Sequence, residues 1–323
     1  MAKSAPLLEN LPQELLDLII SWLLLADVAH LCTCNKNLAI RVQPIQFGTA
    51  KRVDHAMKWA CGRGTETAVR AAISYGASAS TVLIGTDNQG EPIRTLTLYL
   101  AAKQQQPDGF QVLIDLGARV DVGGVRPSIV TKLVNRLCAK PRFLVRFIKA
   151  GLVPQLPESL YDGILLAALN IPKDDNTACL ECVDRVLNAG ADPNCVQYRY
   201  RTHKRETISP LSTVILSRRW DLFDLLVRRG GDIKMVRDPP RPYTPPLCSF
   251  HVPIMAAAAS MATAPDRVDP EPVQRCINAG ADINLTIPST WGDYFYFIIP
   301  VLLYLNSVTS WEEKAEQGGR DAA

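Results

Sequence analysis

Two cysteines have the spacing best suited to metal chemistry, because Cys179 and Cys182 are separated by two residues. A structural zinc site needs four ligands, and the nearest further candidates are Cys195 and His203. The same Cys182 also fits the inner face of a helix, one turn before Val186. We therefore interpret the pair as core residues, and we expect neither a bound metal nor a cofactor.

The sequence also lacks the common patterns of catalytic and phosphate-binding sites. The four histidines do not form an HExxH motif or any other metal-ligand spacing. Residues 85–90 (GTDNQG) lack the Lys-Ser/Thr pair that completes a phosphate-binding loop. The sequence therefore predicts no enzyme activity, and the function is expected to lie in binding surfaces.

Two long segments between apolar runs carry side chains suited to binding a protein. The segment 195–209 contains the basic and aromatic stretch YRYRTHKR, which would suit an acidic peptide. The segment 232–250 contains RDPPRPYTPP, whose prolines favour an extended loop that loses less entropy on binding. A solvated insertion without a partner is the alternative for both. The candidate binding residues are Tyr198, Arg199, Tyr200, Arg201, Arg205, Arg241 and Tyr243.

The composition is typical of a folded chain, with 323 residues, 47% of them apolar and 21% charged. This length suits two domains or a repeat array. The net charge of +3 is too small to indicate nucleic-acid binding, and the apolar run 294–305 is too short to span a bilayer. We therefore expect neither a nucleic acid nor a membrane as a partner. Nine cysteines without an N-terminal secretory pattern indicate an intracellular protein of the cytoplasm or nucleus.

A glycine follows an apolar segment at six places along the chain, 34 to 50 residues apart. Apolar residues stand seven, four and three positions before each of them, which places the apolar side chains on one face of a helix. Glycine ends a helix easily because it adopts the left-handed conformation without a Cβ penalty. The sequence therefore predicts helices that end at Gly76, Gly117, Gly151, Gly190, Gly230 and Gly280.

Shorter apolar segments lie between these glycines, and each is long enough for one more helix. They are residues 56–60, 98–102, 130–137, 164–169, 211–216 and 254–259. The repeating unit is then a helix, a short turn, a second helix, a glycine and a loop. A single helix pair cannot bury its apolar face, so the pattern predicts a stack of such units.

The ends of these units resemble ankyrin repeats. The strings VLNAGADPN (186–194) and CINAGADIN (276–284) match the family's pattern well, and SPLSTVI (209–215) resembles its first-helix start. The resemblance implies an all-α solenoid of helix-turn-helix units over residues 50–305. It would contain about six repeats and a partial last unit, followed by a polar tail at 306–323. Structural roles are implied for the six glycines and for Asp192, Asp232 and Asp282.

Residues 7–47 follow a different pattern. The apolar residues Leu15, Leu16, Ile19, Ile20 and Leu23 recur at helical spacing and cover two faces of the predicted helix. Such a helix needs two partners. One is provided by the next predicted helices, 27–34 and 36–42. The other is either the repeat array or a different protein.

This segment resembles an F-box, most specifically in the string LPQELLDLIISWL (11–23). It departs from the family at Val28, where leucine is usual, and at residues 35–37, where an arginine is common. An F-box is a three-helix domain that binds the Skp-type adaptor of an SCF-type cullin–RING ubiquitin ligase. The chain thus resembles fungal-type F-box/ankyrin proteins, which implies adaptor contacts at Leu11, Pro12, Leu15, Ile19, Leu23, Leu31 and Leu38.

Two functions follow from these resemblances. In the first, the protein is a non-catalytic substrate-recognition adaptor: the F-box binds the Skp-type adaptor and cullin, and the repeats bind a protein substrate. In the second, it is an interaction scaffold whose N-terminal helices only cap the solenoid. The first requires the surface between Leu11 and Leu38 to be partly exposed. The second requires it to be buried against residues 51–61.

Overall fold

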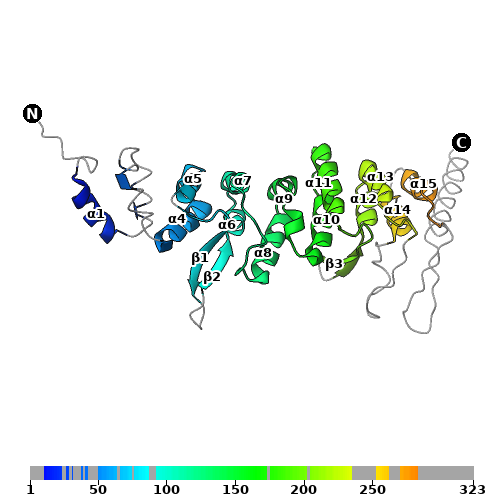
Figure 1. Ribbon diagram of the computed structural model, residues 1–323. Helices are drawn as coiled ribbons and strands as arrows, with labels where there is room; N and C mark the ends of the chain where they lie inside the picture. Colours follow the sequence, from blue (N-terminus) through cyan, green and yellow to red (C-terminus); the bar gives the residue numbers. More distant parts are fainter. Residues whose placement is uncertain are drawn as a thin grey trace, which may run out of the picture. The chain divides into compact units, whose positions relative to one another are not determined.

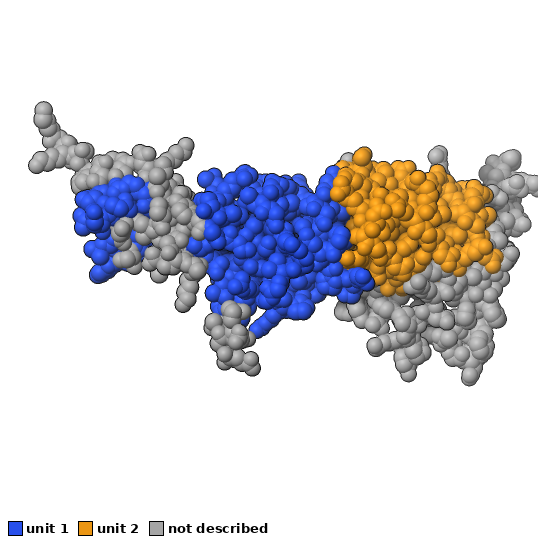
Figure 2. Space-filling model, viewed as in Figure 1, with its two compact units in different colours: residues 1–160 blue, residues 161–323 orange. Residues whose placement is uncertain are grey.

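The computed structural model describes most of the chain in short blocks. These are residues 11–23, 27–28, 31, 38, 41–42, 50–63, 66–74, 76–86, 92–172, 175–201, 204–234, 252–261 and 270–282. They are mostly helical and belong to two compact units, residues 1–160 and 161–323 (Figure 2). The predicted partial last repeat and the polar tail lie outside the described residues.

Unit 1 contains α1 (Gln13–Trp22) and stacked helix pairs (Figure 1). Each first helix packs on the next first helix, α4 on α6 and α6 on α8, while α5 packs on α7 and α7 on α9. Two short 3₁₀ helices follow α9. The bounds are α4 (Ala50–Arg63), α5 (Glu66–Ser74), α6 (Thr97–Lys103), α7 (Pro107–Asp115), α8 (Pro127–Cys138), α9 (Pro141–Lys149), η2 (Val153–Gln155) and η3 (Glu158–Leu160).

Unit 2 repeats the same arrangement, with α10 packed on α12, α12 on α14 and α11 on α13. The predicted start of α12 is confirmed, because Ser209 caps the helix and Pro210 occupies its first position. The bounds are α10 (Tyr161–Leu169), α11 (Asn176–Asn188), α12 (Pro210–Leu216), α13 (Trp220–Arg228), α14 (Pro253–Met261) and α15 (Glu271–Asn278).

The second helices α5, α7, α9, α11, α13 and α15 all end in the same way. Each is followed by one of the six predicted glycines, whose φ angles lie between 71° and 108°. The Gly190 amide donates to the Leu187 carbonyl, and the Ala191 amide donates to the Val186 carbonyl, as in a Schellman motif. The other five glycines have the same pair of bonds. The recurring phrase is thus a helix ending.

Two of the predicted aspartates, Asp192 and Asp232, organise the corners after their glycines. The carboxylate of Asp192 accepts a hydrogen bond from the Asn194 amide at 2.8 Å, and Asp232 accepts one from the Lys234 amide at 2.8 Å. The Asn194 side chain then reaches the next corner: it donates to the Gly230 carbonyl at 2.9 Å and accepts from the Asp232 amide at 2.7 Å. Neighbouring corners in unit 2 are therefore joined directly.

Two antiparallel hairpins correct the all-α prediction. In unit 1, β1 (Thr81–Thr86) pairs with β2 (Pro92–Leu96), and the register shifts between Leu83 and Gly85. In unit 2, β3 (Gln197–Arg201) pairs with β4 (Lys204–Ile208). Both hairpins lie between a glycine and the next first helix. The β-branched residues at 81, 82 and 84 and the alternation of polar and apolar residues favour strands in these corners.

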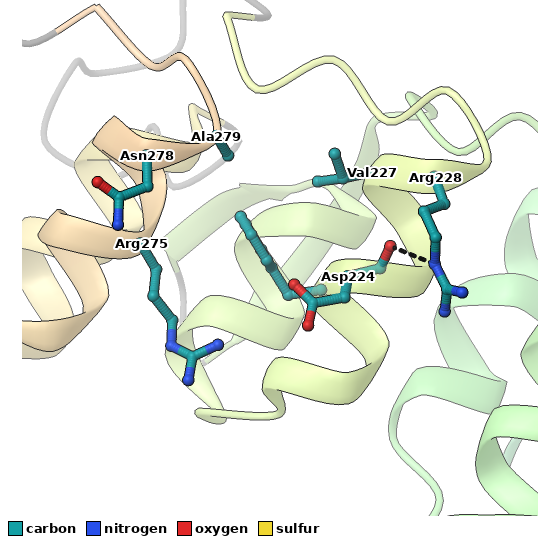
Figure 3. A pocket seen from close by; sticks show the side chains of 7 residues that line it. Asp224, Val227, Arg228, Arg275, Asn278 and Ala279 are labelled. Carbon is teal, nitrogen blue, oxygen red and sulfur yellow. Dashed lines mark hydrogen bonds between the residues drawn. The ribbon is translucent and has the colours of Figure 1, made fainter.

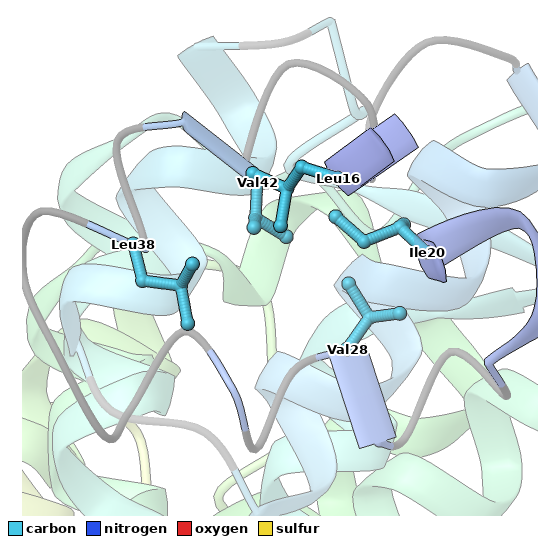
Figure 4. Packing of buried hydrophobic residues seen from close by; sticks show 5 residues of the cluster. All are labelled: Leu16, Ile20, Val28, Leu38 and Val42. Atoms are coloured by element: carbon cyan, nitrogen blue, oxygen red, sulfur yellow. The ribbon is translucent and has the colours of Figure 1, made fainter. Parts of the chain in front are cut away.

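The N-terminal segment forms a small core of its own, composed of Leu16, Ile20, Val28, Leu38 and Val42 (Figure 4). The described residues of the next two predicted helices, 27–28, 31, 38 and 41–42, are helical. Arg41 also donates hydrogen bonds to the Leu11 carbonyl at 2.5 Å and to the Gln13 side chain at 3.1 Å. These bonds hold the start of α1 against the third predicted helix.

Candidate protein-interaction site

Helix α1 has two apolar faces with different surroundings. Leu16 and Ile20 are almost fully buried in the N-terminal core. On the other face, Leu15, Leu18, Ile19 and Trp22 have exposed fractions of 49%, 56%, 37% and 84%. These positions follow the spacing i, i+3, i+4, i+7, which forms one continuous line along a helix. We call these four residues the α1 stripe.

The predicted adaptor-contact residues fall into two groups. Pro12, Leu15 and Ile19 are exposed, and Leu11 is half-buried. The remaining three belong to the interior of the N-terminal segment, with Leu38 in its core and Leu23 and Leu31 packed against it. Sequence reasoning missed Leu18 and Trp22. Their helical spacing from Leu15 and Ile19 was the signal that could have identified them.

The predicted basic loop is the β3–β4 hairpin. Tyr198, Arg199, Tyr200 and Arg201 lie in β3, and Arg205 lies in β4, where it pairs with Tyr200. The other loop candidates, Arg241 and Tyr243, lie outside the described residues.

A pocket of about 620 Å³ lies between α13 and α15 in unit 2 (Figure 3). Arg275 is held beside it by an ion pair with Glu271 at 2.9 Å and by stacking over Trp220. Arg228 donates from Nε to the backbone carbonyl of Asp224. The pocket thus combines guanidinium groups and one carboxylate with apolar side chains, a set suited to binding more than to acid–base chemistry. Its lining residues are Phe223, Asp224, Val227, Arg228, Arg275, Asn278 and Ala279.

The CxxC cysteines lie in the interior of unit 2, as the core interpretation expects. Cys179 and Cys182 are both fully buried on α11, and the Cys179 thiol lies 3.2 Å from the Ala168 carbonyl. Burial raises the pKa of Cys179 and thereby disfavours the thiolate that would bind a metal. The part of the chain that the structure describes contains no cluster of three or more potential metal ligands.

Buried thiols elsewhere are expected to resist alkylation. Burial raises the pKa of Cys61 and of Cys276 to about 12, so the thiolate is a minute fraction at pH 8. We expect both to stay unmodified by iodoacetamide in the folded protein and to react completely in urea. Peptide mass spectrometry would measure this. Rapid labelling of Cys61 or Cys276 without urea would contradict the buried positions.

Comparisons with known proteins give structural neighbours alone. No protein-family model and no curated protein matches the chain. It is similar to the ankyrin repeat domain of Bcl-3, a unique member of the IkappaB protein family, with 18% identity and a TM-score of 0.40 over 72% of this chain and 88% of that chain. The human ASB11 ankyrin repeat domain is similar with 16% identity and a TM-score of 0.38, over 71% and 86%. Neither likeness tells what this chain binds.

The described residues are mostly helical, and the two solved structures named above are ankyrin-repeat domains. No helix among the residues described is both long and apolar enough to cross a membrane.

Proposed function

We propose that this chain is a non-catalytic ankyrin-repeat protein that recruits a protein substrate to a cullin–RING ubiquitin ligase. Its N-terminal segment would bind a Skp-type adaptor as an F-box, and its helix pairs would hold the substrate. The observation that carries the proposal is the α1 stripe, an apolar surface in solvent on a helix whose opposite face is already buried.

The composition and exposure of the α1 stripe favour a protein partner. Contiguous apolar surface on a soluble chain commonly marks an interaction site. Trp22, with 84% of its surface exposed, is the kind of side chain that anchors protein interfaces. A helix that merely capped the repeats would bury this face against them. The exposure of all four residues therefore supports the adaptor function over the alternative of a capped scaffold.

The two faces of α1 would have different roles when the segment binds an adaptor. Leu16 and Ile20 fasten α1 to its own small core, so the helix is already formed before a partner arrives. A preformed helix loses little conformational entropy on binding. The buried residues Leu38 and Val42 would support the surface from behind without touching the adaptor.

Co-purification tests this proposal directly. The full chain would be expressed with the Skp-type adaptor and the cullin of the same organism. Replacing Leu15, Ile19 and Trp22 by alanine is expected to remove adaptor binding, because truncating a central anchor alone costs about 2 kcal/mol or more. The matched control is Ile84→Ala with Leu216→Ala, which removes exposed apolar side chains elsewhere.

Both variants would first be compared with the original chain by circular dichroism. Loss of binding in the α1 variant alone supports the adaptor function. If the folded original chain does not bind the adaptor, the F-box proposal is wrong and an interaction scaffold remains.

A further inference from the structure

The helix pair α8–α9 lies in the longest stretch of the chain without an acidic residue. Residues 122–157 include no Asp or Glu but seven basic residues. The remaining 287 residues contain 28 basic and 32 acidic residues, a net charge of −4 at pH 7. The small net charge of the whole chain therefore does not reveal that one repeat is strongly basic. The seven basic residues are Arg126, Lys132, Arg136, Lys140, Arg142, Arg146 and Lys149.

Four of these side chains are exposed and without a partner among the described residues: Lys132, Arg136, Lys140 and Arg142. We call them the basic surface. They belong to α8, to the turn after it and to α9 (Figure 1). Arg146, on the same helix as Arg142, donates instead to the Pro107 carbonyl.

In two of the other second helices, α11 and α15, the equivalent positions carry an ion pair. Nine and five residues before the helix-ending glycine, α11 has Glu181 and Arg185, which form an ion pair at 2.9 Å. Helix α15 has Glu271 and Arg275 there, also paired at 2.9 Å. In α9 the acidic partner is replaced, because Arg142 stands nine residues before Gly151. Arg142 of the basic surface thus stands where α11 and α15 have a paired carboxylate.

This arrangement is unfavourable for the helices themselves. Arg142 lies in the first turn of α9, where the helix dipole favours an acidic side chain. Lys132 and Arg136 are four residues apart on α8, and like charges at this spacing repel each other. These charges lower the stability of the exposed helices, so helix formation does not explain their presence. Binding of an anionic partner does.

The character of the surface favours a peptide over nucleic acid or a membrane. Phe143 and Phe147, the aromatic residues of α9, are buried and cannot stack on bases. The described residues of α8 and α9 include no exposed large apolar side chain that could anchor in lipid. The net negative charge of the remaining chain would repel an extended polyanion but not a short acidic segment.

We propose that the basic surface of α8 and α9 binds an acidic, extended peptide segment of a protein partner. Alternate side chains of an extended peptide are about 7 Å apart, close to the distance of about 6 Å between Lys132 and Arg136 one helical turn apart. The proposal is independent of the F-box assignment, since the surface would serve an adaptor and a scaffold equally.

Fluorescence anisotropy with the full chain tests the proposal. The probe is a fluorescein-labelled peptide in which Glu alternates with Gly, and its control has Gln in place of Glu. We expect binding of the Glu peptide only, weakening with salt. Lys132→Glu with Arg136→Glu should reduce affinity about tenfold or more, as for the reversal of two charge pairs. The matched control, Lys58→Glu with Lys234→Glu, changes net charge equally at exposed lysines elsewhere and should bind as the original chain does.

Arg142→Glu separates binding from folding. An acidic residue in the first turn of α9 is favoured by the helix dipole, so this variant should melt no lower than the original chain while binding the peptide more weakly. Equal loss of affinity in the Lys58/Lys234 control would show unspecific attraction and overturn the proposal. So would unchanged binding in the Lys132/Arg136 variant, or tighter binding of single-stranded DNA or anionic vesicles through the same residues.

Discussion

Arg219→Ala is expected to lower the free energy of unfolding of unit 2 by about 3 kcal/mol, because it removes three hydrogen bonds of a buried guanidinium group. Arg219 is only 6% exposed. It donates to the carbonyls of Leu169 and Ile171 at 3.0 and 2.7 Å and to the Asn176 side chain at 3.1 Å. One side chain at the start of α13 thus binds the end of α10 and the start of α11.

Two variants place limits on this effect. Arg219→Lys keeps the charge but presents a single point donor, so we expect an intermediate loss of stability. Arg228→Ala removes an exposed arginine from the other end of α13 and should change stability by less than about 0.5 kcal/mol. Urea unfolding followed by circular dichroism gives the free energies, and hydrogen exchange localises the loss to α10 and α11. If Arg219→Ala is as stable as Arg228→Ala, the buried bonds do not stabilise unit 2.

Phe110→Ala is expected to destabilise unit 1 by about 4 kcal/mol, since it combines lost burial with a cavity. Phe110 on α7 is fully buried, and its ring meets the Phe143 ring of α9 edge-to-face, with centroids 5.1 Å apart. The contact joins two successive helix pairs. Stability in a stacked array depends on contacts between neighbours, so this loss should affect both pairs.

Phe110→Leu is the matched control, because it retains most of the volume and should cost less than about 1.5 kcal/mol. The midpoints of urea unfolding would rank the two variants. Hydrogen exchange should rise in both α7 and α9 for the alanine variant. An equal, small shift for alanine and leucine would mean that the helices close the cavity, and the expected coupling would then be wrong.

The helices could be predicted because their signals are local. The apolar residues before Gly117, for example, occupy one helical face, and the glycine that follows has the conformation for which side chains are penalised. The cap at Ser209 is equally local. The short apolar run 98–102 predicts a helix, and it lies within α6.

The hairpins and the surface of α1 could not be predicted in the same way. The predicted repeat unit consists of two helices and a loop, so it does not include the strands β1 and β2. The β-branched residues around Val82 nevertheless favour strands. For α1, the pattern predicted two apolar faces. The pattern alone does not tell which face lies in solvent. The F-box resemblance implies contacts at Leu15 and Ile19 on the exposed face, while Leu18 and Trp22 stand outside the pattern positions that carry this resemblance.

The basic residues of α8 and α9 can be read from the sequence, but the small net charge of the whole chain does not reveal them. A net charge of +3 describes the chain correctly and still says nothing about residues 122–157, where acidic residues are absent. Only the placement of Lys132 and Arg136 on the exposed face of one helix makes the local charge meaningful.

The corner contact made by Asn194 has a consequence for how such a chain can change. The groups that it binds in the next corner, the Gly230 carbonyl and the Asp232 amide, are main-chain groups. Every amino acid has the first and all but proline have the second. The neighbouring unit can therefore exchange its outward side chains without breaking the joint, and a new binding specificity can arise there while the architecture is inherited intact.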